Sequence, residues 1–173
     1  MNRTVWAMTK QLRKGSFKPE GYEVSFGSGK IDRIDTCETE DQVYVKILDY
    51  KTGAKSFDMA AFYHGLQMQL VVYMEEAVRL EERKHPGKKI VPAGIFYYRM
   101  KDPIVGKELD EEKLEEAILK ELRLDGIIRQ EDAVIQRLDA DFSGNSLVIP
   151  AGKTKSGYSK ASKMLLPEEF DAV

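Results

Sequence analysis

Apolar and polar residues alternate along three stretches in the first third of the chain. Residues 22–27, 29–35 and 43–51 follow this period of two, which is typical of β-strands with one buried face. Polar residues 39–42 separate the second and third stretches. We therefore expect these two strands to pair as an antiparallel hairpin.

Helical spacing dominates the middle of the chain. Between residues 58 and 84 apolar side chains recur at steps of three and four, which predicts one long helix with a single buried stripe. Ser56 or Asp58 can cap its start, and Pro86-Gly87 stops it. The expected stripe consists of Phe62, Leu66, Leu70, Tyr73, Met74, Ala77 and Leu80.

The remaining segments complete an alternation of strands and helices. Further helices are predicted at 3–14, 110–124 and near 131–139, and further strands at 93–100 and 146–149. The end of the chain, 151–173, is rich in Gly, Ser and Lys and is expected to be an irregular tail. Sheet and helices in this order predict an α/β fold, a mixed β-sheet flanked by helices.

Composition narrows the class of protein. A chain of 173 residues, 42% hydrophobic and 32% charged, fits one globular domain over 1–173. Its longest strictly apolar run, Leu70 to Met74, is far too short to span a membrane. The single cysteine, Cys37, excludes an internal disulfide and a cysteine-rich metal site within this chain, so an intracellular, cytoplasmic protein is the simplest interpretation.

Charge is nearly balanced overall but unevenly distributed. The net charge of −2 gives no support to an autonomous nucleic-acid binder. Residues 1–20 and 152–163 are nevertheless basic, and they either gather into a phosphate-binding face or form a solvated surface. The segment AGKT at 151–154 is no phosphate-binding loop, because Leu147 stands where that pattern needs glycine.

Two acidic residues of the predicted hairpin are expected to face each other. In the strand ending ILDYKTG, Asp49 and Lys51 share a face with the apolar residues before them. If the hairpin folds about Glu40 and Asp41, Asp32 lies directly opposite Asp49. Two facing carboxylates repel each other unless a divalent cation such as Mg²⁺ lies between them. A bulge at the turn would shift this register by one residue.

The acid pair together with Lys51 suits hydrolysis of a phosphodiester. A lysine ammonium beside a bound metal can orient the attacking water and stabilise charge on the phosphate. The alternative is an ordinary ion pair at the end of a strand, between Asp49 and Lys51. On spacing alone the ion pair is favoured, because Asp-x-Lys is a common tripeptide.

Three sequence motifs that occur in order favour the hydrolytic site over the simple ion pair. The segments GKIDRID, ILDYKTG and HGLQMQLVVYM resemble the RecB-like branch of the PD-(D/E)XK nucleases, and the likeness covers most of the chain. It is close to the nuclease domain at the C-terminal end of the B subunit of AddAB-type helicase–nucleases, to which FYHGLQMQL and SKASKMLLPEEF are also similar. The resemblance implies a restriction-endonuclease-like fold.

The resemblance also implies roles for particular residues. Asp32 and Asp49 would be metal ligands, with the backbone carbonyl of Tyr50 as a further ligand, and Lys51 would be the catalytic lysine. Gln69 and Tyr73 would form the Q-x-x-x-Y motif that contacts DNA or supports the lysine. Their four-residue spacing places them on one helix face, although Tyr73 as a core residue merely flanked by Gln69 is the alternative.

Two other acidic residues are placed less directly. Glu23 points away from the apolar face of its strand, as an upstream site glutamate of related nucleases would, or as an ordinary exposed residue. Asp35 lies opposite in direction to Asp32, and we expect a structural role for it.

The chain also departs from the family pattern. Many such nucleases have a metal-binding histidine before the first acidic motif, whereas His64 and His85 both follow Asp32. Relatives often carry an iron–sulfur cluster on flanking cysteines, which Cys37 does not match, so a cluster could belong to a parent protein but not to this chain. Both gaps suggest a fragment of a larger subunit.

These expectations combine into one hypothesis and two alternatives. The leading interpretation is a deoxyribonuclease domain that uses Mg²⁺ or Mn²⁺, cuts DNA as an exonuclease during recombinational repair, and works with an AddA-like helicase–nuclease subunit and without a membrane. The first alternative is a catalytically silent DNA-binding or scaffolding module of the same complex. The second is an interaction domain in which the acidic pair is incidental.

Overall fold

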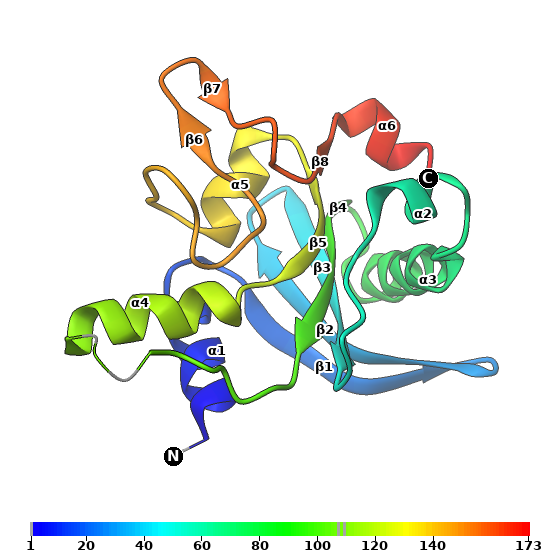
Figure 1. The fold of residues 1–173 in the computed structure, drawn as a ribbon. Coiled ribbons are helices and arrows are strands. Elements are labelled where there is room, and N and C mark those ends of the chain that lie inside the picture. The colour runs from blue at the N-terminus through cyan, green and yellow to red at the C-terminus, as the bar shows by residue number, and fades with distance from the viewer. Residues whose placement is uncertain (1, 107, 109) are drawn as a thin grey trace.

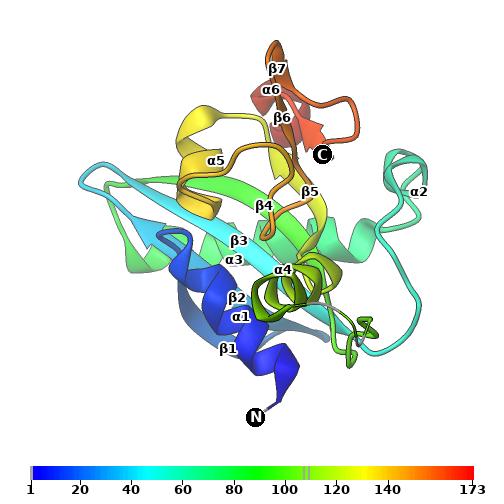
Figure 2. The ribbon, with the colours of Figure 1, turned by 60° about the vertical axis from the view of Figure 1, so that its left-hand side comes forward.

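A mixed six-stranded sheet runs through the centre of the protein (Figures 1 and 2). The computed structural model describes residues 2–106, 108 and 110–173. The strand order is β1-β2-β3-β4-β5-β8, where β3–β4 and β5–β8 are parallel and the other neighbours are antiparallel. These strands are β1 (Lys18–Phe26), β2 (Gly29–Glu38), β3 (Gln42–Lys51), β4 (Lys89–Arg99), β5 (Asp125–Arg129) and β8 (Met164–Leu165).

Helices cover both faces of this sheet (Figures 1 and 2). Apolar residues of α3 pack on one face, and those of α5 pack on the other. The first helix contacts the fourth, and a small third cluster of apolar residues lies between them. The helices are α1 (Arg3–Arg13), α2 (Met59–Tyr63), α3 (Met68–Lys84), α4 (Glu111–Glu121), α5 (Asp132–Leu138) and α6 (Pro167–Asp171). The expected α/β class, a restriction-endonuclease-like mixed sheet flanked by helices, is confirmed.

The central position of β3 follows from its sequence. All residues from Val43 to Asp49 are buried, so the strand is covered on both faces. It then crosses over through α2 and α3 to the parallel strand β4, and a parallel pair requires such a crossover. The polar end of β3 therefore lies beside the polar end of β4.

The long helix predicted from 58 to 84 is in fact two helices. Asp58 does cap the first one, accepting hydrogen bonds from the N–H groups of Ala60 and Ala61. The chain then breaks at Gly65, whose φ of +72° favours glycine and is incompatible with a continuous right-handed helix. Leu66, expected in the buried stripe, is 79% exposed as a result.

The C-terminal third differs most from expectation. Strand β5 was not predicted, and residues 146–149 do not form a strand. Instead, the buried hydroxyl of Ser146 accepts hydrogen bonds from the N–H groups of Val148 and Ile149, which holds this segment as a tight turn. The expected irregular tail contains regular elements: the hairpin strands β6 (Lys153–Thr154) and β7 (Gly157–Tyr158), then β8 and α6.

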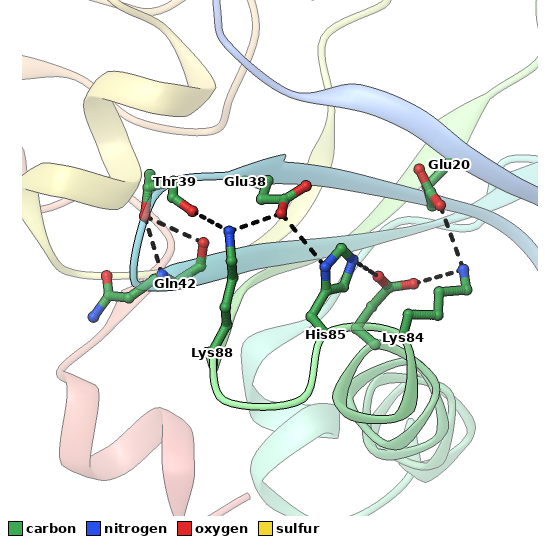
Figure 3. A network of polar contacts seen from close by, with 8 residues as sticks. Glu20, Glu38, Thr39, Gln42, Lys84, His85 and Lys88 are labelled. Carbon is green, nitrogen blue, oxygen red and sulfur yellow. Dashed lines mark hydrogen bonds and ion pairs between the residues drawn. The ribbon is translucent and has the colours of Figure 1, made fainter.

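A polar network fastens the C-terminal end of α3 to the tip of the β2–β3 hairpin (Figure 3). Lys88 Nζ donates to a carboxylate oxygen of Glu38 at 2.8 Å and to the carbonyl of Thr39 at 2.7 Å. His85 lies between Glu38, at 3.5 Å, and Glu81, at 3.3 Å. Because Glu81 is fully buried, this network fixes the helix against the hairpin. Within the described residues, no helix is long and apolar enough to cross a membrane.

Candidate active site

Asp32 and Asp49 lie at adjacent positions where the β2–β3 ladder ends. The antiparallel register pairs Glu38 with Val43 and continues to Arg33 with Leu48, which is the register expected from the sequence. The next positions are Asp32 and Asp49. There the backbone ladder stops. Instead, a carboxylate oxygen of Asp32 accepts a hydrogen bond from the Tyr50 N–H, with an N···O distance of 2.9 Å.

The Asp49 side chain contacts Lys51 on the same strand. Its Oδ2 lies 2.5 Å from Lys51 Nζ, and the two side chains are 11% and 24% exposed. That oxygen is buried, yet it accepts no hydrogen bond of normal geometry from the part of the chain that the structure describes. An incompletely satisfied carboxylate oxygen of this kind is suited to a cation.

Burial and charge perturb both groups. Burial raises the pKa of the Asp49 carboxyl; Lys51 opposes this rise, and the negative charge of Asp32 adds to it. Burial by itself would lower the pKa of the Lys51 ammonium, but the contact with Asp49 and the charge of Asp32 outweigh it and the pKa is raised. Lys51 is therefore held as an ammonium beside two carboxylates that repel each other.

The parallel strand β4 contributes an aromatic wall that sequence reasoning missed. Tyr97 pairs with Asp49 in the β3–β4 register, and Lys51 Nζ lies 5.3 Å from the centroid of its ring. Lys55 lies over the same ring at 5.7 Å. The aromatic run at the end of this strand was visible in the sequence, but its partner strand was not.

The backbone of Tyr50 also faces the acid pair. Its N–H donates to Asp32, and the N–H and C=O of one strand residue point to the same side. The carbonyl is thus directed toward the β2 side, where the ladder has ended. Its phenol extends to the opposite face of the sheet, where the hydroxyl lies 3.4 Å from Arg33.

Gln69 and Tyr73 are brought together on α3. Gln69 Nε2 donates to the Tyr73 hydroxyl at 2.7 Å, as their four-residue spacing allows. The Tyr73 ring is only 8% exposed and packs edge-on against Phe26 at 5.5 Å. The tyrosine is therefore a core residue whose hydroxyl holds an exposed glutamine. Within the described residues, neither side chain hydrogen-bonds to Asp32, Asp49 or Lys51.

Glu23 lies beside Asp32 in the strand register, but its side chain contacts Lys30. The pairs Tyr22–Arg33 and Val24–Ile31 flank the two positions. Glu23 has a φ of +48°, its side chain is 76% exposed, and it contacts Lys30 at 2.9 Å. The contact with Lys30 lowers the pKa of Glu23. In this arrangement Glu23 is an exposed strand residue and not part of the acid pair.

The residues at the pair fit a hard divalent cation. Two carboxylates and one backbone carbonyl are oxygen ligands of the kind that Mg²⁺ and Mn²⁺ take, with water and substrate completing the shell. Among the described residues, however, no group of three or more His, Cys, Asp or Glu side chains could hold a metal. His64 is exposed at the end of α2, His85 belongs to the network of Figure 3, and Cys37 is buried as a free thiol.

Behind the acid pair, on the other face of the hairpin, lies a buried ionic cluster. Arg33 makes two contacts of 2.6 Å to Asp35, and Lys46 Nζ lies 3.4 Å from the same carboxylate. The Arg33 and Asp35 side chains are 1% and 0% exposed. Asp35 has the structural role expected for it, and the cluster stiffens the strand segment that carries Asp32.

The fold and the match to a family model define the class of protein as a nuclease. A family model for the PD-(D/E)XK nuclease superfamily matches residues 1–147, and the chain belongs to that family.

Curated relatives extend the comparison. Each of them is named as the B subunit of an ATP-dependent helicase/deoxyribonuclease. The chain is similar to the one from Lachnoclostridium phytofermentans, at 38% identity over 98% of this chain and 16% of that relative. It is likewise similar to those from Alkaliphilus metalliredigens, at 36% identity over 96% of this chain and 16% of the relative, and from Thermoanaerobacter sp. strain X514, at 34% over 99% and 17%. The chain thus spans about a sixth of the length of the curated relatives that it matches.

Proposed function

We propose that the chain is a nuclease domain that hydrolyses DNA phosphodiesters with Mg²⁺ or Mn²⁺. The observation that carries the proposal is the placement of Asp32 and Asp49 at facing positions of the hairpin, with the Lys51 ammonium in contact with Asp49. Two like charges in this position gain nothing for the fold. A cation bound by both reverses the sign of that interaction.

Asp32, Asp49 and the Tyr50 carbonyl would hold the metal. A divalent cation supplies Lewis-acid activation of water and neutralisation of phosphate charge when it is bound. Lys51 Nζ lies beside Oδ2 of Asp49. With Asp49 engaged elsewhere, the ammonium is free to donate hydrogen bonds to a phosphate oxygen or to position the attacking water. The Tyr97 ring limits where the lysine can move.

The Gln69–Tyr73 pair would support this site through a contact with DNA rather than with the acid pair. Tyr73 is fixed by its burial, and its hydroxyl orients the exposed amide of Gln69. An amide held in this way can donate to a DNA phosphate without loss of side-chain freedom on binding. Glu23 would join the site only if its contact with Lys30 were given up.

The larger setting is inferred from the relatives, whose name describes the B subunit of an ATP-dependent helicase/deoxyribonuclease. We infer that this chain acts as the nuclease domain of such a helicase–nuclease. In that setting it would be an exonuclease that processes double-strand breaks for recombinational repair. Its partners would be DNA and an AddA-like subunit.

Variants that remove one charge each test the catalytic assignment. Lys51→Gln should lower the rate of cleavage by roughly 10²–10³-fold, the usual effect of removing one donor aimed at developing charge, and Asp49→Asn should lower it further through loss of metal. The matched control is Lys55→Gln, since Lys55 is a cation near the same tyrosine ring without a contact to Asp49. Rates are measured on labelled DNA with Mg²⁺ or Mn²⁺, for the chain and for the full helicase–nuclease assembly. Cleavage at the parent rate by either site variant would overturn the assignment.

A catalytically silent DNA-binding or scaffolding module is the second candidate. It is favoured by the lack, among the described residues, of a third acidic or histidine ligand near the pair. Crystals soaked in Mn²⁺ separate the two functions. Anomalous density between Asp32 and Asp49, lost in Asp32→Asn, supports the nuclease; an empty pair at high Mn²⁺ concentration supports the silent module.

A further inference from the structure

A basic pocket lies at the end of β4, next to the end of the strand β3 that carries Asp49 and Lys51. In the parallel register Lys51 pairs with Arg99, and in the next antiparallel register Tyr97 pairs with Asp125 at the start of β5. Beside these residues, near the junction of α4 and β5 (Figure 1), is a cavity of about 260 Å³. Its charged lining residues are Arg99, Lys120, Glu121, Arg123, Asp125 and Lys163.

Cations exceed anions in this lining. Four basic side chains face two carboxylates, which leaves an excess of two positive charges (4 − 2 = 2). Glu121 is already engaged by Lys101 from outside the pocket, at 2.9 Å. Asp125 is shared by Lys163, at 2.7 Å, and by the N–H of Phe57, at 2.8 Å. Asp125 also lies 3.6 Å from Arg99, so Lys120 and Arg123 are the lining cations without an ion pair among the described residues.

Arg99 carries a buried donor that lacks an acceptor. Its contact with Asp125 is a long 3.6 Å, and its buried Nε has no hydrogen-bond partner among the described residues. A guanidinium carries five N–H donors in a planar fork that matches a phosphate. An unpaired buried donor destabilises a fold unless a ligand completes it. The pocket therefore combines positive charge with a donor that lacks an acceptor.

We propose that this pocket binds a backbone phosphate of the DNA strand, adjacent to the phosphate that is cut at Asp32 and Asp49. The proposal rests on the proposed nuclease function. Arg99 is the strand neighbour of Lys51, so the two phosphate contacts lie side by side on parallel strands. The bound strand then runs from the acid pair across the end of β4 toward the C-terminal end of α4. Phosphates at both points fix the position of the linkage that is cut.

The salt dependence of DNA binding tests the pocket without relying on cleavage. Fluorescence anisotropy follows a labelled single-stranded oligonucleotide bound to the 173-residue chain in EDTA, where no cleavage takes place. The slope of log K against log salt is negative, and for single strands each lost phosphate contact decreases its magnitude by about 0.7. We expect this decrease in Arg99→Gln and again in Arg123→Gln.

A variant on the same helix serves as the control. Lys113 lies in the first turn of α4, pairs with Asp110, and its side chain is 70% exposed, so Lys113→Gln should keep the parent slope. Thermal unfolding checks that each variant is folded. If Arg99→Gln fails to fold, Arg123→Gln and Lys120→Gln carry the test, because neither residue has an ion pair among the described residues.

Each outcome is decisive for the pocket and separable from the nuclease proposal. Unchanged slopes in the folded pocket variants overturn the inference, and so does a chain that binds no DNA. Loss of inorganic-phosphate binding with an unchanged DNA slope identifies a site for a free anion and also overturns it. If the slopes become less steep but no DNA is cut with Mg²⁺ or Mn²⁺, the pocket inference stands and the nuclease proposal fails. If DNA is cut but the slopes are unchanged, the nuclease proposal stands and the pocket inference fails.

Discussion

The buried cluster behind the acid pair offers a direct test of what holds the hairpin in place. In Asp35→Asn the shape of the side chain is kept and its charge is lost. Arg33 and Lys46, with 1% and 5% of their side chains exposed, then share no counter-ion within the cluster. Breaking a buried ion pair on one side costs about 3–5 kcal/mol. For a chain of this size each kcal/mol shifts Tm by about 2–4 °C, so we expect Tm to fall by roughly 6–20 °C.

Thermal unfolding followed by circular dichroism at neutral pH measures this effect, and urea unfolding gives the free energy. The matched control is Asp49→Asn, the same change on the same hairpin but on the opposite face. It removes both an ion pair and the repulsion from Asp32, so the free energy of unfolding should change by no more than about 1 kcal/mol. If Asp35→Asn unfolds within about 2 °C of the parent, the cluster does not hold the hairpin and the reasoning is refuted.

Lys46, the third member of the cluster, gives a second prediction, in which stability depends on pH. Burial lowers the pKa of Lys46, the charge of Arg33 lowers it further, and Asp35 opposes both. A lysine with a lowered pKa destabilises the fold when it is charged in both states, and this cost disappears as pH rises through the lowered pKa to the ordinary 10.5. Lys46→Met should therefore be more stable than the parent at neutral pH. The difference should shrink in alkaline solution, and a difference that is constant with pH would contradict the argument.

Two further changes test α3 and the β4–β5 contact. Gln69→Leu keeps a good helix former but removes the donor to Tyr73, so DNA cleavage should fall while Tm stays near that of the parent; unchanged cleavage would leave the pair as core packing only. Gly126→Ala should destabilise the fold by about 1–3 kcal/mol, because its added methyl group would overlap the carbonyl of Ile95. Gly106→Ala, which meets no neighbour, is the control in the same unfolding assay.

Local patterns predicted the first half of the fold well. The β2–β3 hairpin has a strict period of two and a short polar turn, so its register could be counted from the sequence. The cap at Asp58, one of the two candidates named from the sequence, was predicted for the same reason, since a cap depends only on nearby backbone groups. The facing positions of Asp32 and Asp49 follow directly from that register.

Features that depend on distant segments were missed. The five-residue strand β5 opens with Asp125-Gly126, which resembles a turn, yet the glycine is needed because β4 approaches it closely. The helix break at Gly65 was hidden because apolar spacing continued across it. Tyr97 and Arg99 reach the site only through parallel pairing of β3 with β4, which no local pattern reveals.

The repulsive acid pair persists because the rest of the hairpin leaves it little freedom to separate. Its tip is tied to α3 by the network of Figure 3, and its middle is held by the Arg33–Asp35 contacts on the opposite face. The backbone ladder ends just before Asp32, and the Asp32 carboxylate accepts a hydrogen bond from the Tyr50 N–H. The two strand ends therefore cannot separate without breaking this hydrogen bond. The free energy that keeps the two carboxylates together is thus supplied by contacts outside the acid pair, together with the hydrogen bond from the Tyr50 N–H to Asp32. A cation bound there would find its ligands already in position, and the pair would be stabilised by the metal rather than assembled by it.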